Sequence, residues 1–191
     1  MREQTLEIFL KNRIMMRSYK TMVLALVLCM MAWFIDAKAQ DVQYYPIDQV
    51  EQIAKKGHKK ILIEVFTQWS DGFRQLEREA LRQQQIVSYL NDKFLTVKFD
   101  AETRSDVSFR DRTYRYVSKS GVGFNELAAE LLQGQMAYPT FIFLDENMNL
   151  IQTIKYHSPE QFEMIITYFG DNNHKKIPWK KYEKNYVPMK K

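Results

Sequence analysis

Hydrophobic and polar positions divide much of the chain into short, almost continuously apolar segments of strand length. These segments are residues 60–67, 94–99, 140–144 and 150–154. The apolar run of the first segment is interrupted only by Glu64, and such runs are typical of strands covered on both faces. Residues 145–149 separate the last two segments, which predicts a hairpin-type connection there.

Between these segments, apolar residues recur at helical spacing. The helical patterns cover residues 47–54, 72–81, 86–91, 127–132 and 162–169. Gly57 closes the first pattern and Gly170 closes the last. Ser158, Pro159 and Gln161 open the last one as an N-cap, a proline at the first helical position and a capping-box partner. Alternation of helices and strands at this spacing predicts an α/β fold with a parallel sheet core.

An insertion interrupts this alternation in the second half of the chain. Residues 107–109 and 114–117 have strand character and flank the polar residues 110–113. We therefore expect a small hairpin with a polar tip, inserted between core elements. Residues 121–123 are then expected to lead into the helix over residues 127–132.

The N-terminal region has the layout of a secretory signal peptide. Residues 22–35 form a 14-residue apolar run, which is too short for a comfortable membrane span. Arg13, Arg17 and Lys20 precede the run, and an A-x-A cleavage pattern at residues 37–39 follows it. We expect cleavage before Gln40 and a periplasmic or secreted protein. A retained anchor helix is the alternative, and we expect membrane contact only in that case.

Charge is concentrated at the two ends of the chain. The formal net charge is +5, but residues 1–39 carry six Lys or Arg against three acidic residues, and residues 175–191 carry seven Lys against Glu183 alone. The part between them is slightly acidic, which argues against a phosphate-binding face and so against a nucleic-acid partner. We expect a signal peptide over residues 1–39, one domain over residues 40–172 and a basic, aromatic tail over residues 173–191.

The tail carries Trp179, Tyr182 and Tyr186 at helical spacing. The simple interpretation is a short amphipathic helix that docks onto the domain. The alternative is a helix that binds a partner or a membrane surface.

No cofactor or metal is predicted. Asp100, Glu102, Asp106 and Asp111 lie close together in sequence, but their spacing matches no cation-binding loop and arginines alternate with them. A solvated charged loop explains them better. His157 near Glu160 lacks the further ligands that zinc requires.

Residues 61–77 read as a buried strand, a turn at Trp69 and a helix start, and they resemble the active-site segment of thioredoxin-like proteins. In that superfamily the tryptophan is followed by Cys-x-x-Cys, whereas this chain has Ser70-Asp71-Gly72-Phe73. Tyr138-Pro139-Thr140, at the start of a later strand, matches the place where these proteins have a cis-proline facing the turn. With residues 123–128, these motifs look most like bacterial exported thioredoxin-like proteins. The resemblance implies a central mixed sheet flanked by helices, with the small hairpin as an insertion.

Dithiol chemistry is not expected, because thiol–disulfide exchange needs an attacking thiolate and a resolving thiol. The single cysteine, Cys29, lies in the apolar run that is expected to be removed. Ser70 is explained as an N-cap, which is worth about 0.5–2 kcal/mol. A nucleophilic serine would need a base, and none of the histidines, His58, His157 and His174, has a spacing that points to Ser70. We therefore predict no catalytic residue.

Phe73 leaves two interpretations open. It either fills the space beneath the turn, contributing roughly 1.5–3 kcal/mol if fully buried, or forms an apolar patch with Trp69 beside Pro139. Gly72 is free to take a positive φ, which would change the shape of the turn. The resemblance implies a groove that holds extended peptide segments, with Thr140 backbone groups available for pairing. The predicted groove residues are Trp69, Ser70, Asp71, Gly72, Phe73, Tyr138, Pro139 and Thr140.

Two hypotheses about function follow. The first is a non-redox, non-catalytic module of the bacterial envelope that binds a protein or an extended peptide segment through this groove. The second is a degenerate member of a thiol–disulfide oxidoreductase system that acts as a regulatory subunit or decoy.

Overall fold

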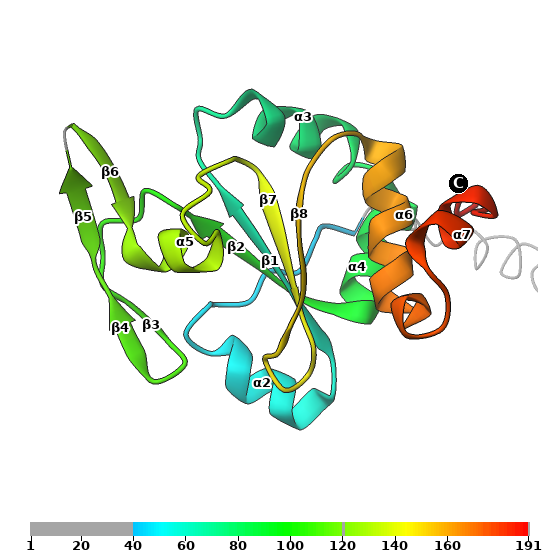
Figure 1. Ribbon diagram of the computed structural model, residues 1–191, viewed down its shortest axis with the longest axis horizontal. Coiled ribbons are helices and arrows are strands. Elements are labelled where there is room, and N and C mark those ends of the chain that lie inside the picture. Colours follow the sequence, from blue (N-terminus) through cyan, green and yellow to red (C-terminus); the bar gives the residue numbers. More distant parts are fainter. Residues whose placement is uncertain (1–39, 120, 191) are drawn as a thin grey trace, which may run out of the picture. The chain divides into compact units, whose positions relative to one another are not determined.

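A computed structural model describes residues 40–119 and 121–190 of the chain. The predicted signal peptide over residues 1–39 lies outside the described residues. A central sheet is built from β1 (Lys60–Phe66), β2 (Phe94–Asp100), β7 (Thr140–Leu144) and β8 (Leu150–Lys155). Its strand order is β2-β1-β7-β8, as Figure 1 shows. β1 pairs in parallel with β2, while β7 runs antiparallel to both β1 and β8. The predicted mixed sheet is therefore confirmed.

Alternate residues of β1 point into two separate hydrophobic cores, as the two-residue period of a strand requires. Ile61 and Ile63 pack on one face of the sheet, against α2 (Val50–Gly57) and α5 (Glu126–Leu131). Leu62 packs on the other face. That second core is closed by α3 (Asp71–Glu79), α4 (Gln84–Lys93) and α6 (Pro159–Gly170). Every residue of β1 is buried, so burial on both faces explains its nearly unbroken apolar sequence.

The ends of α6 follow the sequence signals. The Ser158 side chain accepts a hydrogen bond from the Gln161 backbone N–H at 3.2 Å, and Pro159 is the first helical residue. Gly170 is the last residue of the helix. A side chain at Gly170 would collide with Tyr89, since a Cβ there would lie 2.5 Å from the tyrosine hydroxyl oxygen. The predicted N-terminal cap is confirmed.

The insertion differs from its prediction, because it contains two hairpins instead of one. The strands are β3 (Val107–Phe109), β4 (Arg112–Tyr114), β5 (Tyr116–Lys119) and β6 (Val122–Asn125). The first turn is shorter than expected and consists of Arg110 and Asp111, both with positive φ. Residues 122–123, expected to lead into a helix, lie in β6 instead. The second hairpin escaped prediction because its strands are short and partly polar. Both hairpins lie to one side of the central sheet (Figure 1).

The C-terminal tail docks onto α6 through an aromatic cluster and hydrogen bonds. The short helix α7 (Trp179–Lys184) follows a 3-10 turn at Asn173–Lys175. The Trp179 and Tyr168 rings meet edge to face with centroids 5.1 Å apart, and the Tyr182 hydroxyl lies 2.8 Å from Thr167 Oγ1. The Tyr186 hydroxyl donates to Glu163 at 2.7 Å. Of the two interpretations of the tail, the structure therefore agrees with a short helix that docks onto the domain.

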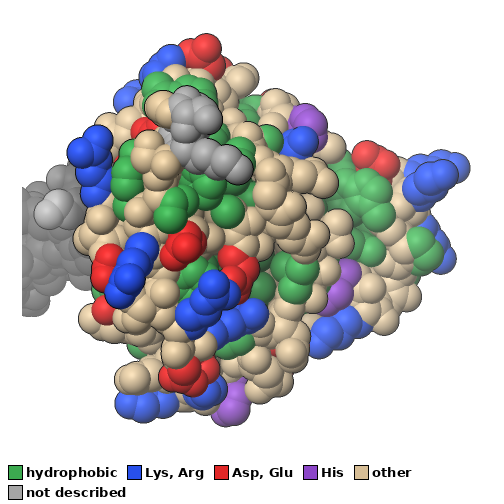
Figure 2. Space-filling model, turned by 60° about the vertical axis from the view of Figure 1, so that its left-hand side comes forward, with side chains coloured by type: hydrophobic (Ala, Val, Ile, Leu, Met, Phe, Trp, Pro, Cys, Tyr) green, Lys and Arg blue, Asp and Glu red, His purple; other side chains and the backbone are tan. Residues whose placement is uncertain are grey.

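Surface charge on the domain is mixed. Figure 2 shows acidic and basic side chains interspersed on one face, with hydrophobic side chains visible between them.

Within residues 40–119 and 121–190, no helix combines the length and apolar character needed to cross a membrane.

Replacing Tyr186 with phenylalanine should destabilise the domain by about 1–2 kcal/mol, because it removes a hydrogen bond to a carboxylate. Glu163 is 7% exposed and otherwise accepts only from the Met189 backbone N–H, at 2.7 Å, in the described part of the chain. Urea denaturation measures the change, with Val187→Ala as the control, since Val187 is 80% exposed. Equal midpoints for Tyr186→Phe and the unmodified chain would contradict the proposed anchoring of the tail.

Candidate functional site

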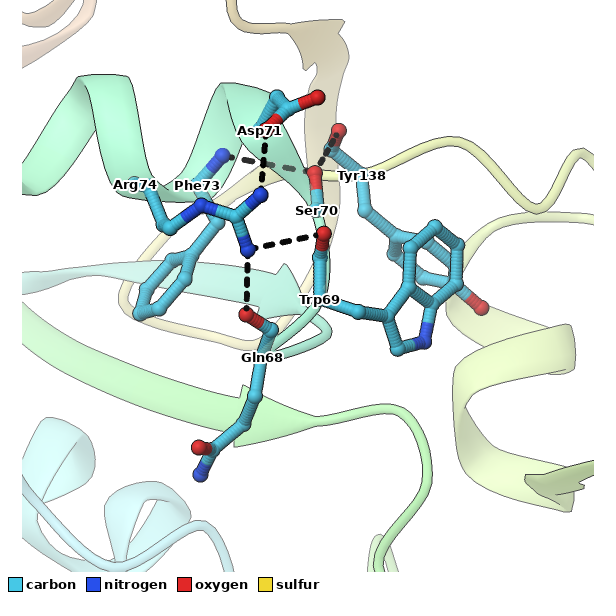
Figure 3. Close-up of polar contacts among 7 residues, drawn as sticks. All are labelled: Gln68, Trp69, Ser70, Asp71, Phe73, Arg74 and Tyr138. Atoms are coloured by element: carbon cyan, nitrogen blue, oxygen red, sulfur yellow. Dashed lines mark hydrogen bonds and ion pairs between the residues drawn. The ribbon is translucent and has the colours of Figure 1, made fainter.

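The turn between β1 and α3 is organised by the Ser70 hydroxyl. Ser70 has an extended backbone and caps α3, accepting a hydrogen bond from the Phe73 backbone N–H at 3.4 Å. The same hydroxyl donates to the backbone carbonyl of Tyr138 at 2.9 Å, as Figure 3 shows. The predicted N-cap is confirmed, and it also links the turn to the loop before β7.

That loop approaches the turn closely. The Tyr138–Pro139 peptide bond is cis. A Cβ at Gly72 would lie 3.0 Å from Pro139 Cδ and 3.3 Å from the Tyr138 carbonyl oxygen. Gly72 lies within α3 and is absent from the positive-φ residues of the described chain, so the expectation of a positive φ is wrong. Close approach of Pro139 is the reason that glycine fits here.

Phe73 fills the space beneath the turn. It is 9% exposed, and its ring stacks on Phe66 with centroids 4.4 Å apart. The Lys98 ammonium lies 4.6 Å from the centre of the Phe73 ring. The Phe73 side chain and the Trp69 ring extend from the turn in different directions (Figure 3). The space-filling interpretation therefore holds, and Phe73 contributes no surface patch beside Trp69.

Trp69 is the exposed member of the turn. Its side chain is 62% exposed, and its indole N–H donates to Glu102 Oε1 at 3.0 Å. The Tyr138 ring meets the indole edge to face, with centroids 6.0 Å apart and planes at 89°. We call these two rings, which lie together in Figure 3, the aromatic surface.

The remaining predicted residues have supporting positions. Thr140 is buried within β7 and aligns with Val65 of β1 on one side and Lys155 of β8 on the other. It therefore offers no free backbone edge to a ligand, which corrects that part of the prediction. Pro139 is also buried. Asp71 is exposed and forms an ion pair with Arg74.

Arg74 secures the turn from its outer side. Its guanidinium donates to the Gln68 carbonyl at 3.3 Å and to the Trp69 carbonyl at 3.0 Å, in addition to its bond with Asp71 (Figure 3). The backbone at Trp69 thus follows directly from β1 and is fixed by the hydrogen bonds from Arg74.

Glu64 is a buried carboxyl group whose properties were not predicted. It is 1% exposed, and its Oε1 atom has no hydrogen-bond partner among the described residues. Burial raises the pKa of Glu64 to about 8, although the Lys98 ammonium opposes this shift. The available signal was an acidic residue in the interior of the otherwise apolar segment 61–67. At neutral pH the folded protein therefore holds a largely neutral carboxyl group in the core, on the same side of β1 as Phe66.

The surroundings of Ser70 do not resemble a nucleophilic centre. Ser70 is 6% exposed, and both of its side-chain hydrogen bonds go to backbone groups. No histidine hydrogen-bonds to it in the described part of the chain. Residues 40–119 and 121–190 also contain no group of three or more His, Cys, Asp or Glu side chains that could hold a metal ion.

A separate cavity of about 570 Å³ lies along β8 and α6, away from the turn. The lining residues come from β8, α6 and the C-terminal tail and share no sequence motif, so the cavity was not predicted. Its walls are mainly apolar and come from Ile151, Gln152, Ile154, His157, Gln161, Ile165, Tyr168, Phe169, His174 and Trp179.

The sheet order, the capped turn after β1 and the proline at the start of β7 define a thioredoxin-like protein. Solved structures support this fold. A thioredoxin-fold protein from Helicobacter pylori has a TM-score of 0.51 at 13% identity, covering 66% of this chain and 79% of that one. A thioredoxin from Thermus thermophilus has a TM-score of 0.51 at 13% identity, covering 68% and 88%.

The chain belongs to the family Thioredox_DsbH, described as "Protein of unknown function, DUF255", whose model matches residues 26–185. No curated protein matches the chain. The resemblance stated from the Trp69 and Pro139 motifs is thus confirmed at the level of the thioredoxin-like superfamily.

Replacing Glu64 with glutamine should remove a pH dependence of stability. Because folding raises the pKa of this carboxyl from 4.5 to about 8, the folded chain retains a proton that the unfolded chain releases between these values. The free energy of unfolding therefore falls as pH rises through that window, by at most about 1.4 kcal/mol per pH unit. The Glu64→Gln variant should lack this slope and be the more stable protein near pH 8.

Urea denaturation across this pH range measures the slope. The exposed Glu79→Gln variant serves as a control and should retain the behaviour of the unmodified chain. If Glu64→Gln and the unmodified chain have the same slope, Glu64 is ionised in the folded state and the assignment is wrong.

Proposed function

We propose that this protein is a non-catalytic, exported thioredoxin-fold module that binds a protein or an extended peptide segment at the aromatic surface. One observation carries the proposal: Trp69 is 62% exposed and held in place beside Tyr138, while the positions of both thiols are occupied by buried residues that support the turn. An exposed tryptophan on a rigid backbone is a common anchor in protein interfaces.

Backbone groups next to the aromatic surface support the same function. The Tyr138 N–H forms no hydrogen bond with any described residue, although the neighbouring Ala137 N–H and Tyr156 N–H are both bonded. An extended segment could accept from this N–H while its side chains contact the rings, a recurring mode of peptide recognition. This function requires neither a thiol nor a nucleophile.

Export is the second part of the proposal. It rests on the basic residues, the 14-residue apolar run and the A-x-A pattern that precede Gln40. The expected location is the periplasm or the exterior of the cell, where an unfolded or extended segment of another exported protein would be accessible.

A degenerate role in a thiol–disulfide oxidoreductase system is the second candidate, because the chain belongs to a family whose name refers to thioredoxin and DsbH. In this case the surface would bind redox partners as a decoy or regulatory subunit.

The aromatic surface is tested by placing a photo-crosslinking residue at Trp69 in producing cells, with Leu150 as the matched position. Leu150 is 51% exposed and lies on β8. We expect a specific adduct from Trp69 only. Trp69→Ala should then weaken binding of the purified adduct partner by about thirtyfold, the loss typical of an interface anchor. Leu150→Ala should not weaken it. The absence of an adduct at Trp69, or identical adducts at both positions, would rule out this function.

The double substitution Ser70→Cys with Phe73→Cys separates the two candidates. Phe73 packs against Phe66, the last residue of β1. A cysteine at position 73 would therefore lie beneath the turn, next to the strand that contains the buried Glu64. If the peptide-binding function is correct, we expect no disulfide reductase activity from the double variant. Measurable turnover of a disulfide substrate would instead favour the degenerate oxidoreductase. Far-UV circular dichroism of the variant shows whether the fold is retained.

A further inference from the structure

We propose that the aromatic surface selects extended peptides that carry an arginine or lysine side chain, held against Trp69 and Tyr138 and paired with Glu102 and Asp100. This inference rests on the proposed peptide-binding function and adds the chemistry of the ligand. Three features carry it: the exposed Trp69 indole beside the half-buried Tyr138 ring, two carboxylates that have no cationic partner among the described residues, and basic side chains near the turn that already have other partners.

The rings provide the apolar contact. Trp69 is 62% exposed, and Tyr138 meets it edge to face with planes at 89°. In this arrangement Tyr138 supports the indole from the side. A guanidinium or ammonium group is attracted to the face of a tryptophan ring, by about 0.5–1 kcal/mol at exposed sites.

The carboxylates provide the charge. Glu102 uses Oε1 to accept from the Trp69 indole at 3.0 Å, and Asp100 uses Oδ1 to accept from the Glu102 backbone N–H at 2.9 Å. Neither carboxylate forms an ion pair with any other residue in the described ranges. Both act on the Tyr138 hydroxyl: burial raises the pKa of Tyr138 to about 12, with Glu102 and then Asp100 adding to the shift. The two negative charges therefore lie beside the aromatic surface.

Basic side chains near the turn are already engaged. Arg74 is bonded to Asp71 and to two backbone carbonyls, and Lys98 is paired with Glu77. The Arg104 guanidinium lies over the Tyr116 ring, 5.4 Å from its centre. The negative charge of Asp100 and Glu102 is thus left for a ligand, although acidic and basic side chains are mixed elsewhere on the surface (Figure 2).

Three short capped peptides of alternating valine and threonine test the inference. They carry arginine, neutral citrulline or glutamate at the central position, and binding to the purified protein is measured by fluorescence anisotropy. We expect the arginine peptide to bind about five- to tenfold more tightly than the citrulline peptide, and the glutamate peptide to bind most weakly. Added salt should reduce the preference, because the carboxylates are accessible to solvent.

Isosteric variants identify the groups responsible. Glu102→Gln still accepts from the Trp69 indole, and Asp100→Asn still accepts from the Glu102 N–H, so the surface keeps its shape while each variant removes one charge. The preference for arginine should be lost when both substitutions are combined. Asp106→Asn is the control: it removes the same charge from the same loop, but Asp106 already faces Arg115 at 3.7 Å. The control should keep the preference.

The outcomes distinguish a failure of the charge selection from a failure of the proposed peptide-binding function. Equal binding of the three peptides, or a preference that survives in the combined variant, overturns the charge selection and leaves peptide binding in place. If none of the peptides binds, the inference is overturned, and the crosslinking result at Trp69 decides the proposed function independently.

Discussion

The antiparallel pairing of β1 with β7 is the constraint on which the candidate site depends. Val65 aligns with Thr140, so the turn that leaves β1 faces the loop that enters β7. Two contacts then bring these segments together: the Ser70 hydroxyl donates to the Tyr138 carbonyl, and Gly72 leaves room for Pro139. The position of Trp69 beside Tyr138 follows from this register. A shift of one residue would move alternate side chains to the opposite face and separate the two rings.

The residues at the two expected thiol positions are explained by different physical causes. Ser70 is small and polar, and its single hydroxyl serves as both acceptor and donor to backbone groups that would otherwise lack these partners. Phe73 is large and apolar, and it joins the core through Phe66. Lys98 lies over the Phe73 ring, and its ammonium opposes the rise that burial causes in the pKa of Glu64. The hydrogen bonds of Ser70 and the packing of Phe73 therefore anchor the turn to the loop before β7 and to the end of β1.

The central strands and most helices could be predicted because their signals are local, whereas the expectation that Pro139 faces the Trp69 turn came from the resemblance to thioredoxin-like proteins. Burial on both faces makes β1 continuously apolar, and Ser158-Pro159 is a recognisable helix start. Which residues of the candidate site are exposed to solvent could not be predicted from local signals. Ser70, Phe73, Pro139 and Thr140 resemble binding residues by position, yet all four are buried. Phe73 packs on Phe66, and Thr140 lies between β1 and β8. The second hairpin was missed because its strands are only four residues long and partly polar.

The charge of the candidate site also arises from tertiary structure. Composition shows a basic chain with a slightly acidic middle, which distinguishes no single surface. Glu102 follows β2 and meets Trp69 across 33 positions of sequence, because β2 runs parallel to β1 and both strands end at the same edge of the sheet. Arg74 and Lys98 then pair with Asp71 and Glu77, closer to α3. Local pairing of these cations, more than the number of acidic residues, determines which carboxylates remain available beside the aromatic surface.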